Sequence, residues 1–224
     1  MKESLKLKLL RVAANNASCT AEVKSLLDFI TKDEKPAESK RVEVKTSLED
    51  GVYVVFSSGE IKPVSEYNEQ CEPAKVLMIY RDHSWIVAPR DAECGETTLL
   101  KEEVDRESGS PFYKAEIEAL NDFDMESCTD HLRKAGLAFE LDDDMFIPTA
   151  GQLAAMWLYR DVLNKALKDT GGEPLNTYEC YWSSSEFNAG YSWYVYFNDG
   201  SVYNDNIKSY DYYVRPCTAF TFSL

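Results

Sequence analysis

The sequence lacks most of the residue patterns that identify an enzyme. It contains two histidines, His83 and His131, which lie in different local contexts with no recognisable nucleophile motif beside either. It has no GxSxG elbow, no P-loop and no GxGxxG fingerprint. None of the six cysteines is spaced as CxxC, so a zinc site is not predicted. We therefore predict no catalytic residue, no metal and no cofactor.

Positive charge and long apolar runs are also scarce. The chain has 24 Lys and Arg against 39 Asp and Glu, a net charge of -15. Nucleic acids and anionic membranes both attract basic proteins, so neither is a predicted partner. No apolar run is long enough to insert into a membrane. Lys2, Glu3, Lys6 and Lys8 interrupt any signal-peptide core, which predicts no signal peptide, reduced cysteines and a cytoplasmic location in the producing cell.

The first two thirds of the chain predict an α+β protein with an N-terminal helical extension. Residues 4–31 read as helical and residues 32–41 as a charged linker. Those helices either pack on their own domain or mediate oligomerisation or virion docking. Strands are predicted at 52–56, 75–80 and 84–88, and short helices at 113–121 and 127–135. The acidic run 142–144 lacks EF-hand spacing and favours a solvated turn over a calcium site.

A longer helix is predicted over 149–167. Its apolar residues recur at helical spacing, Thr149 is a suitable N-cap, and Gly171-Gly172 follows as a stop signal. We expect this helix to form part of the core beneath a C-terminal sheet.

Strict alternation marks the last third of the chain. Trp193, Val195 and Phe197 alternate with polar or tyrosine residues, which predicts a strand with one buried face. Asp199-Gly200 follows and predicts a hairpin turn into a return strand.

The opposite face of this hairpin has an unusual composition. Between residues 187 and 213 there is no Glu, Gln or Arg, and Lys208 is the single Lys. Tyrosine takes many of the positions expected to be exposed, with Asn, Asp and Ser between them. Tyr, Ser, Asn and Gly are typical of antibody paratopes, where Tyr supplies rigid contact area and the small polar residues supply adaptable hydrogen bonds. An ordinary Tyr-rich sheet edge is the alternative to a binding surface.

The stretch 181–220 resembles the variable region of proteins diversified by diversity-generating retroelements. The matching frame is YWSSSE at 181–186, followed by Trp193, Val195, Phe197, Gly200, Val202, Lys208 and Val214-Arg215-Pro216. Residues 147–153 resemble, more loosely, a helix-opening segment of the same family. The resemblance implies a C-type-lectin-like fold of the formylglycine-generating-enzyme type over 42–224, with 1–41 as a separate helical segment and linker.

In that family, mutation of adenines in Asn-type codons never produces Trp, Lys, Glu, Gln or Met. Trp193, Lys208 and Glu186 fall on frame positions here, and the positions between frame residues obey the rule. The scaffold residues implied are Trp182, Trp193, Val195, Phe197, Gly200, Val202 and Arg215. The implied variable, ligand-binding residues are Phe187, Asn188, Gly190, Tyr191, Ser192, Tyr194, Tyr196, Asn198, Asp199, Ser201, Tyr203, Asn204, Asp205, Asn206, Ile207, Ser209, Tyr210, Asp211 and Tyr212.

The resemblance implies a receptor-recognition protein that binds an unknown protein or glycan ligand on a cell surface. It would be either cytoplasmic in the producing cell or assembled into a phage particle. We expect Tyr194, Tyr196 and Tyr203 to be its central anchors, since each neighbours a buried frame residue. A non-diversified bacterial lectin-like adhesin is the main alternative. An enzyme on the formylglycine-generating scaffold is a weaker one, because Cys180 and Cys217 do not match that family's paired cysteines. The calcium-binding sugar motifs of animal C-type lectins are missing too.

Overall fold

A computed structural model describes residues 48–67, 73–101 and 112–222. The chain divides into two compact units, Met1–Val44 and Lys45–Leu224, and every described residue belongs to the second. The predicted N-terminal helices and the charged linker lie outside the described residues.

The first sheet contains the predicted strands of the front half. Its order is β10-β4-β3-β1-β2, with every neighbouring pair antiparallel. The strands are β1 (Gly51–Phe56), β2 (Ile61–Pro63), β3 (Ala74–Tyr80), β4 (His83–Val87) and β10 (Cys217–Ala219). Short 3-10 turns, Val64–Glu66 and Ala92–Cys94, follow β2 and β4. Runs such as VYVVF and VLMI supply β-branched and aromatic residues to the buried centre of the sheet.

The second sheet contains most of the segment 181–220, whose last strand, β10, lies in the first sheet. The order of the second sheet is β5-β9-β6-β7-β8, with β5 (Glu96–Thr97), β6 (Cys180–Glu186), β7 (Ser192–Tyr196), β8 (Ser201–Tyr203) and β9 (Tyr212–Tyr213). The predicted hairpin is confirmed, since β7 pairs antiparallel with β8 and Gly200 turns the chain at φ +75°. A backbone in this left-handed region favours glycine.

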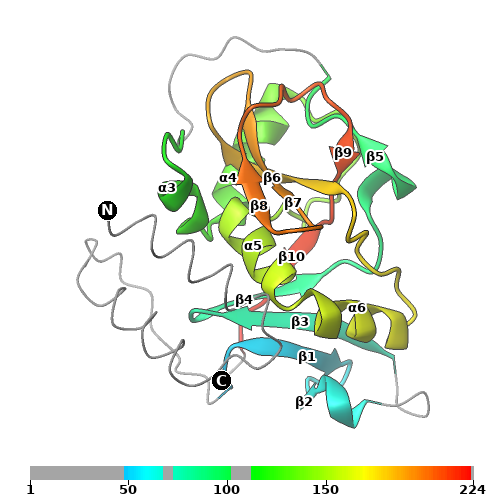
Figure 1. Cartoon of the computed structure of the whole chain (residues 1–224). Coiled ribbons are helices and arrows are strands. Elements are labelled where there is room, and N and C mark those ends of the chain that lie inside the picture. The colour runs from blue at the N-terminus through cyan, green and yellow to red at the C-terminus, as the bar shows by residue number, and fades with distance from the viewer. Residues whose placement is uncertain (1–47, 68–72, 102–111, 223–224) are drawn as a thin grey trace. The chain divides into compact units, whose positions relative to one another are not determined.

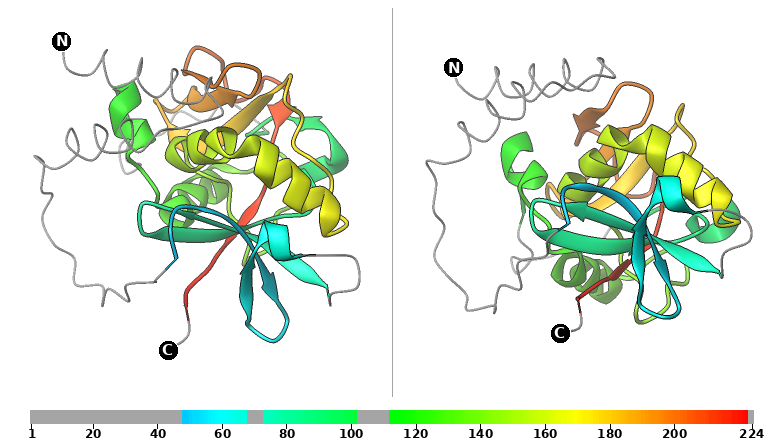
Figure 2. Two further views of the ribbon diagram at one scale, coloured as in Figure 1. Left: turned by 60° about the horizontal axis from the view of Figure 1, so that its bottom comes forward. Right: turned by 90° about the horizontal axis from the view of Figure 1, so that it is seen from below.

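The C-terminal strand connects the two sheets. Only Val214, Arg215 and Pro216 separate β9 in the second sheet from β10 in the first. Figure 2 shows this red segment running from one sheet to the other. In β10, Cys217 pairs with Val87 and Ala219 with Trp85, so the end of the chain is hydrogen-bonded to its early strands.

Four helices accompany the sheets in the described part of the chain: α3 (Glu116–Leu120), α4 (Met125–Ala135), α5 (Ala150–Leu158) and α6 (Arg160–Asp169). The helix predicted over 113–121 is therefore shorter at its start than expected, while α4 begins two residues before the predicted 127–135. Asp124 explains the early start of α4, because its side chain accepts a hydrogen bond from Ser127 N (3.1 Å) and caps the helix.

The prediction of one continuous helix over 149–167 is wrong. The helix breaks at Tyr159, which has φ -102° and ψ 13° and separates α5 from α6. Helix α5 packs on β6 and β7 of the second sheet, whereas α6 packs on β1 and β3 of the first (Figure 1). The break lets the two halves follow different directions and cover different sheets.

Both predicted ends of this helical pair are confirmed. Thr149 Oγ1 accepts from Gln152 N (3.2 Å), and Gln152 Oε1 accepts in return from Thr149 N (2.9 Å). This reciprocal arrangement is a capping box. At the far end Gly171 has φ +81°, and the amides of Gly171 and Gly172 donate to Lys168 O and Leu167 O. No described helix is both long and apolar enough to cross a membrane.

Candidate ligand-binding surface

The inward side of the hairpin is as predicted. Trp193, Val195 and Phe197 are buried, and Trp193 packs with Ala119 of α3 and Ala150 of α5. Val202 is half-buried against the same cluster. The frame residues Trp182 and Arg215 are fully buried.

Gly200 is a frame residue for two reasons. Besides its left-handed backbone, a Cβ at this position would lie 2.5 Å from the Trp157 ring. The Trp157 indole Nε1 in turn donates to Phe197 O (3.0 Å), so the turn rests directly on helix α5.

The opposite side of the hairpin is not uniformly exposed. Tyr194 lies between Trp182 on β6 and Tyr203 on β8 in the strand register, so the three side chains share one face of the sheet. Ring centroids are 5.6 Å apart for both pairs. Tyr212 lies 4.8 Å from Tyr194, and Tyr210 lies 5.1 Å from Tyr212. We call Trp182, Tyr194, Tyr203, Tyr210 and Tyr212 the aromatic row.

Exposure changes along this row. Trp182 and Tyr194 form its buried centre, with Tyr194 5% exposed, and they pack with Leu99, Leu132 and other apolar side chains. Tyr203 and Tyr210 form its ends and are 44% and 53% exposed. The row therefore extends from the core of the domain to its surface.

The prediction that Tyr194 is an exposed ligand anchor is wrong. Its ring is buried among apolar side chains, and the loop between β8 and β9 binds its hydroxyl: Tyr194 OH donates to Asp205 Oδ1 (2.8 Å) and accepts from Asn206 Nδ2 (3.1 Å). Asn206 Nδ2 also donates to Tyr212 OH (2.5 Å). Burial, followed by the hydrogen bond to Asp205, raises the pKa of Tyr194 well above its ordinary value. The residue is a neutral donor that fastens the loop to the sheet.

Replacing Tyr194 with Phe should isolate the contribution of that hydroxyl. We expect the free energy of unfolding to fall by about 1–2 kcal/mol, because Asp205 and Asn206 lose a partly buried hydrogen-bond partner. Tyr203→Phe is the matched control, and should change stability by less than about 0.5 kcal/mol because its hydroxyl makes no hydrogen bond within the described residues. Urea denaturation of both variants checks this, and equal effects would contradict the role given to Tyr194.

Ser192 and Ser201 are also buried, contrary to their predicted exposure. Ser192 Oγ lies 3.2 Å from Ser183 O and 3.0 Å from Ser185 O, so it bonds to the bulged end of β6. A tyrosine would not fit at this position without displacing β6. The period-2 pattern could not reveal this burial, because it depends on segments that cover the sheet from elsewhere in the chain.

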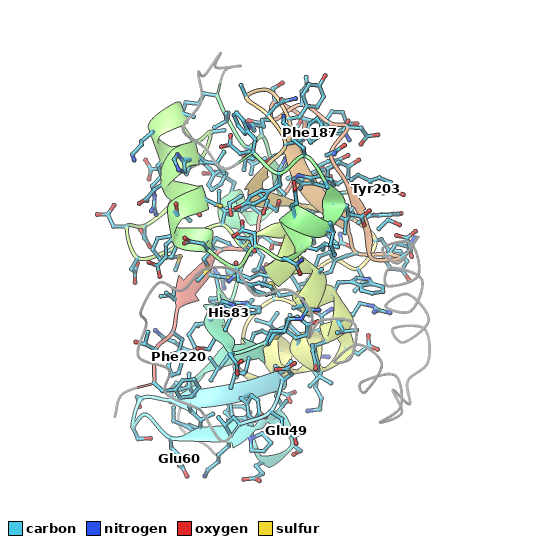
Figure 3. The ribbon with its side chains drawn as sticks, turned by 90° about the vertical axis from the view of Figure 1, so that its left-hand side faces the viewer. Glu49, Glu60, His83, Phe187, Tyr203 and Phe220 are labelled. Atoms are coloured by element: carbon cyan, nitrogen blue, oxygen red, sulfur yellow. The ribbon has the colours of Figure 1, made fainter. Side chains whose placement is uncertain are left out.

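The other predicted variable positions reach solvent. The exposed ones are Tyr191, Asn198, Asp199, Tyr203, Asp205, Ser209, Tyr210 and Asp211. The half-buried ones are Phe187, Asn188, Gly190, Tyr196, Asn204, Asn206, Ile207 and Tyr212. Phe187 and Tyr203 are labelled in Figure 3, at one end of the unit and apart from Glu49, Glu60 and Phe220.

Two frame residues with opposite charges hold the loops of this surface together. Lys208 and Glu186 form an ion pair in which both side chains are 2% exposed. The ammonium of Lys208 also donates to Asn188 O (2.8 Å) and Ala189 O (2.8 Å), and its backbone N donates to Gly190 O (2.9 Å). The loop after β6 and the loop before β9 are therefore joined at Lys208.

A second buried ion pair supports the link between the sheets. Arg215 Nε donates to Asp91 Oδ1 (2.6 Å), and its Nη1 donates to Ala88 O (3.1 Å) and Glu173 O (2.9 Å). Burial nevertheless raises the pKa of the Asp91 carboxyl, even though Arg215 acts in the opposite direction. The sequence pointed to Arg215 as scaffold, but no local pattern pointed to Asp91, which lies far away in the chain.

A polar cluster beneath the surface was missed by the sequence analysis. The buried Asp122 carboxylate accepts from Cys128 Sγ (3.2 Å) and Ser185 Oγ (3.4 Å), beside the Tyr113 hydroxyl. Burial and the Asp122 carboxylate raise the pKa of the Cys128 thiol far above its ordinary value, which keeps it protonated and unreactive. The cluster ties α4 to β6 and does not supply a nucleophile.

The cysteines and the histidines that the structure describes do not gather in the geometry of a metal site. Cys128, Cys180 and Cys217 are free thiols, of which Cys128 and Cys217 are buried and Cys180 is half-buried. His83 stacks on Phe123 with ring centroids 4.6 Å apart. Within the described ranges, no three His, Cys, Asp or Glu side chains gather as metal ligands.

Comparison with known proteins gives a similarity at the level of the fold. No family model and no curated protein matches the chain. The fold is similar to that of a fimbrial protein from Bacteroides ovatus ATCC 8483. That match has a TM-score of 0.50 and 13% identity, and covers 77% of this chain and 49% of the other. The chain thus spans about half the length of that protein, and the similarity concerns the mixed α and β fold alone.

Proposed function

We propose that this chain is a ligand-recognition protein with a C-type-lectin-like domain, whose binding surface is the solvent-facing part of residues 187–212. The observation that supports this most directly is that buried and accessible positions alternate within one short segment and differ in residue type. Buried frame residues hold the strands, while the accessible positions between them are almost all Tyr, Asn, Asp, Ser or Gly. Such side chains suit a binding surface because they offer rigid aromatic area and adaptable hydrogen bonds.

The surface is also rigid where it matters for binding. Trp182 Nε1 donates to Tyr210 O (3.1 Å), so a frame side chain fixes the backbone from which the exposed Tyr210 ring projects. The Tyr203 ring rests on Tyr194. An ordered aromatic side chain loses little conformational entropy on binding, so more of its contact energy is available for affinity. Of the three expected anchors, Tyr203 remains a proposed anchor, the buried Tyr194 is replaced by Tyr210, and the half-buried Tyr196 is no longer a central one.

We further propose that a diversity-generating retroelement rewrites the accessible positions. Changes at exposed strand and loop positions usually alter stability by no more than about 0.5 kcal/mol, so the domain could tolerate many such changes. Ser192, Tyr194 and Ser201 are excluded from the freely variable set by their burial. The flanking DNA decides this point: a reverse-transcriptase gene and a template repeat differing at adenines are the expected result.

One observation favours the undiversified adhesin as a second candidate. Tyr194, Asp205, Asn206 and Tyr212 all belong to the variable set predicted from the sequence, yet they are hydrogen-bonded to one another. A freely rewritten set would not preserve such a network. The similar structure, a fimbrial protein, is compatible with a surface-adhesion role for this chain. Flanking DNA without a template repeat would select this candidate.

Recognition itself can be tested by selection from a library. Randomising Tyr203, Asn204, Ser209, Tyr210 and Asp211, displaying the full chain and selecting on two unrelated purified proteins should yield different binders for each target. Further substitution of the selected residues at 203 and 210 by Ser should abolish binding while the domain stays folded.

The control library should randomise the same number of exposed positions outside the proposed binding surface. Asp142, Asp143, Asp144, Asp161 and Lys165 are suitable because all are exposed. Equal recovery of binders from both libraries would contradict the proposal that residues 187–212 form a dedicated surface.

A further inference from the structure

The charges around the aromatic row are almost all of one sign. The segment 187–213 contains three Asp residues, Asp199, Asp205 and Asp211, and all three are exposed. Its single Lys, Lys208, is buried and paired with Glu186, so it does not offset them at the surface. Glu179 and Glu96 add to the same field: burial and the carboxylates of Glu179, Asp199 and Glu96 raise the pKa of Cys180 to about 11.

The ammonium of Lys114 lies beside the first residue of the segment 187–213. Lys114 donates to Phe187 O (2.6 Å), with its ammonium 4.6 Å from the centre of the Phe187 ring. It therefore faces the loop after β6 rather than the ends of the aromatic row. Its position over Phe187 shows within this chain how a cation is held by an aromatic face of the surface.

Aromatic rings and carboxylates alternate at the exposed ends of the row. Asp211 lies between Tyr210 and Tyr212 in the sequence, and within the described ranges it makes no hydrogen bond or ion pair. At the other end Asp205 follows Tyr203 by two residues and uses Oδ1 to hold Tyr194. A carboxylate beside an exposed tyrosine face can bind a guanidinium or ammonium twice, through the charge and through the ring.

We propose that the partner of this surface is a basic protein segment, whose Arg and Lys side chains stack on Tyr203 and Tyr210 and pair with Asp205 and Asp211. The inference rests on the proposed function, because it specifies the ligand class of the same surface. Anionic ligands are disfavoured by repulsion from the carboxylates, and a neutral glycan could donate hydroxyl hydrogen bonds to them but would supply no opposite charge. The net charge of -15 extends the same preference to longer range, since it steers basic partners toward the domain.

The test is an NMR titration of the 15N-labelled full chain with an acetylated, amidated Gly-Arg-Gly-Arg-Gly-Arg-Gly peptide. The matched probe is the same peptide with citrulline, which keeps the shape of arginine and removes its charge. We expect the arginine peptide to shift the amide signals of residues 203–212 and to bind at least about fivefold more tightly than the citrulline peptide. Raising NaCl from 50 to 300 mM should weaken its binding several-fold, as the ions screen the carboxylates.

Two triple variants separate local charge from net charge. The variant Asp199→Asn/Asp205→Asn/Asp211→Asn should bind the arginine peptide about fivefold or more weakly than the unchanged chain. The variant Asp142→Asn/Asp143→Asn/Asp144→Asn removes the same charge elsewhere, and its affinity for the peptide should change less than about twofold. Asp211→Asn alone disturbs no contact within the described residues. It should still weaken binding about twofold, which guards against a folding defect in the triple variant.

Three results would overturn the inference. Equal binding of the citrulline peptide would leave a binding surface without charge preference, so the proposed function would survive. An equal loss of affinity for the arginine peptide in both triple variants would show that net charge alone attracts the peptide. A lack of any shift in residues 203–212 would reject the basic partner, while the library selection would still decide separately whether the surface binds ligands at all.

Discussion

Replacing Lys208 with Met is expected to lower the free energy of unfolding by about 3–5 kcal/mol, because it leaves the Glu186 carboxylate buried without its lysine. The same substitution removes the donor to Asn188 O and Ala189 O. The loop after β6 would then lose its attachment to the loop before β9. Urea denaturation measures the loss of stability, and hydrogen exchange at the Gly190 and Tyr191 amides measures the opening of the loop.

Lys114→Met is the matched control for this change. Lys114 also donates to a carbonyl of the same loop, that of Phe187, but its side chain is exposed. Its loss should cost less than about 1 kcal/mol. The double variant Glu186→Gln/Lys208→Met should recover at least about 1 kcal/mol relative to Lys208→Met, since it removes the buried charge. Similar losses for Lys208→Met and Lys114→Met would show that burial of the ion pair is not what makes it important.

Gly151→Ala is expected to cost about 3 kcal/mol for a different reason, the absence of space. A Cβ at this position would lie 2.6 Å from Asp122 O and 2.7 Å from Leu120 O, which are backbone atoms at the end of α3 and just beyond it. Asp122 O also accepts a hydrogen bond from the Thr149 hydroxyl (2.6 Å) at the start of α5. The methyl group would push α5 away from α3 and weaken the packing behind Trp193. A lower thermal midpoint checks this.

Gly95→Ala is the control for Gly151→Ala. Its backbone is extended, with φ 172°, and nothing lies within 4 Å of a Cβ added there. Alanine should therefore change stability by less than about 1 kcal/mol in either direction. If both alanine variants were equally stable, the close approach of α3 to α5 would not be a constraint on the fold.

Local pattern was sufficient where a feature depends on neighbours in the chain. The apolar runs of β1, β3 and β4, the Asp199-Gly200 hairpin, the Thr149 cap and the Gly171 stop each depend on a few consecutive residues, and each appears where the sequence predicts it. The same holds for the inward set on β7, because the side-chain period of a strand is two residues.

Pattern was insufficient where a distant segment decides the environment. The 149–167 helix breaks at Tyr159 because its halves pack on different sheets, and periodicity along one helix carries no information about that. Tyr194 and Ser192 have a side-chain period typical of exposure, yet the loop at 204–206 and the bulged end of β6 cover them. Asp91 and Lys208 likewise meet partners far away in the chain.

The sequence by itself determined the strands β1, β3, β4 and β7, the hairpin after β7, the mixed α and β class and the segment in which a Tyr-rich surface would lie, because these follow from short-range periodicity and composition. Only the tertiary structure decided which tyrosines reach solvent and which hold the core. Exposure depends on what packs over a residue, and strand alternation specifies only the direction in which the side chain points.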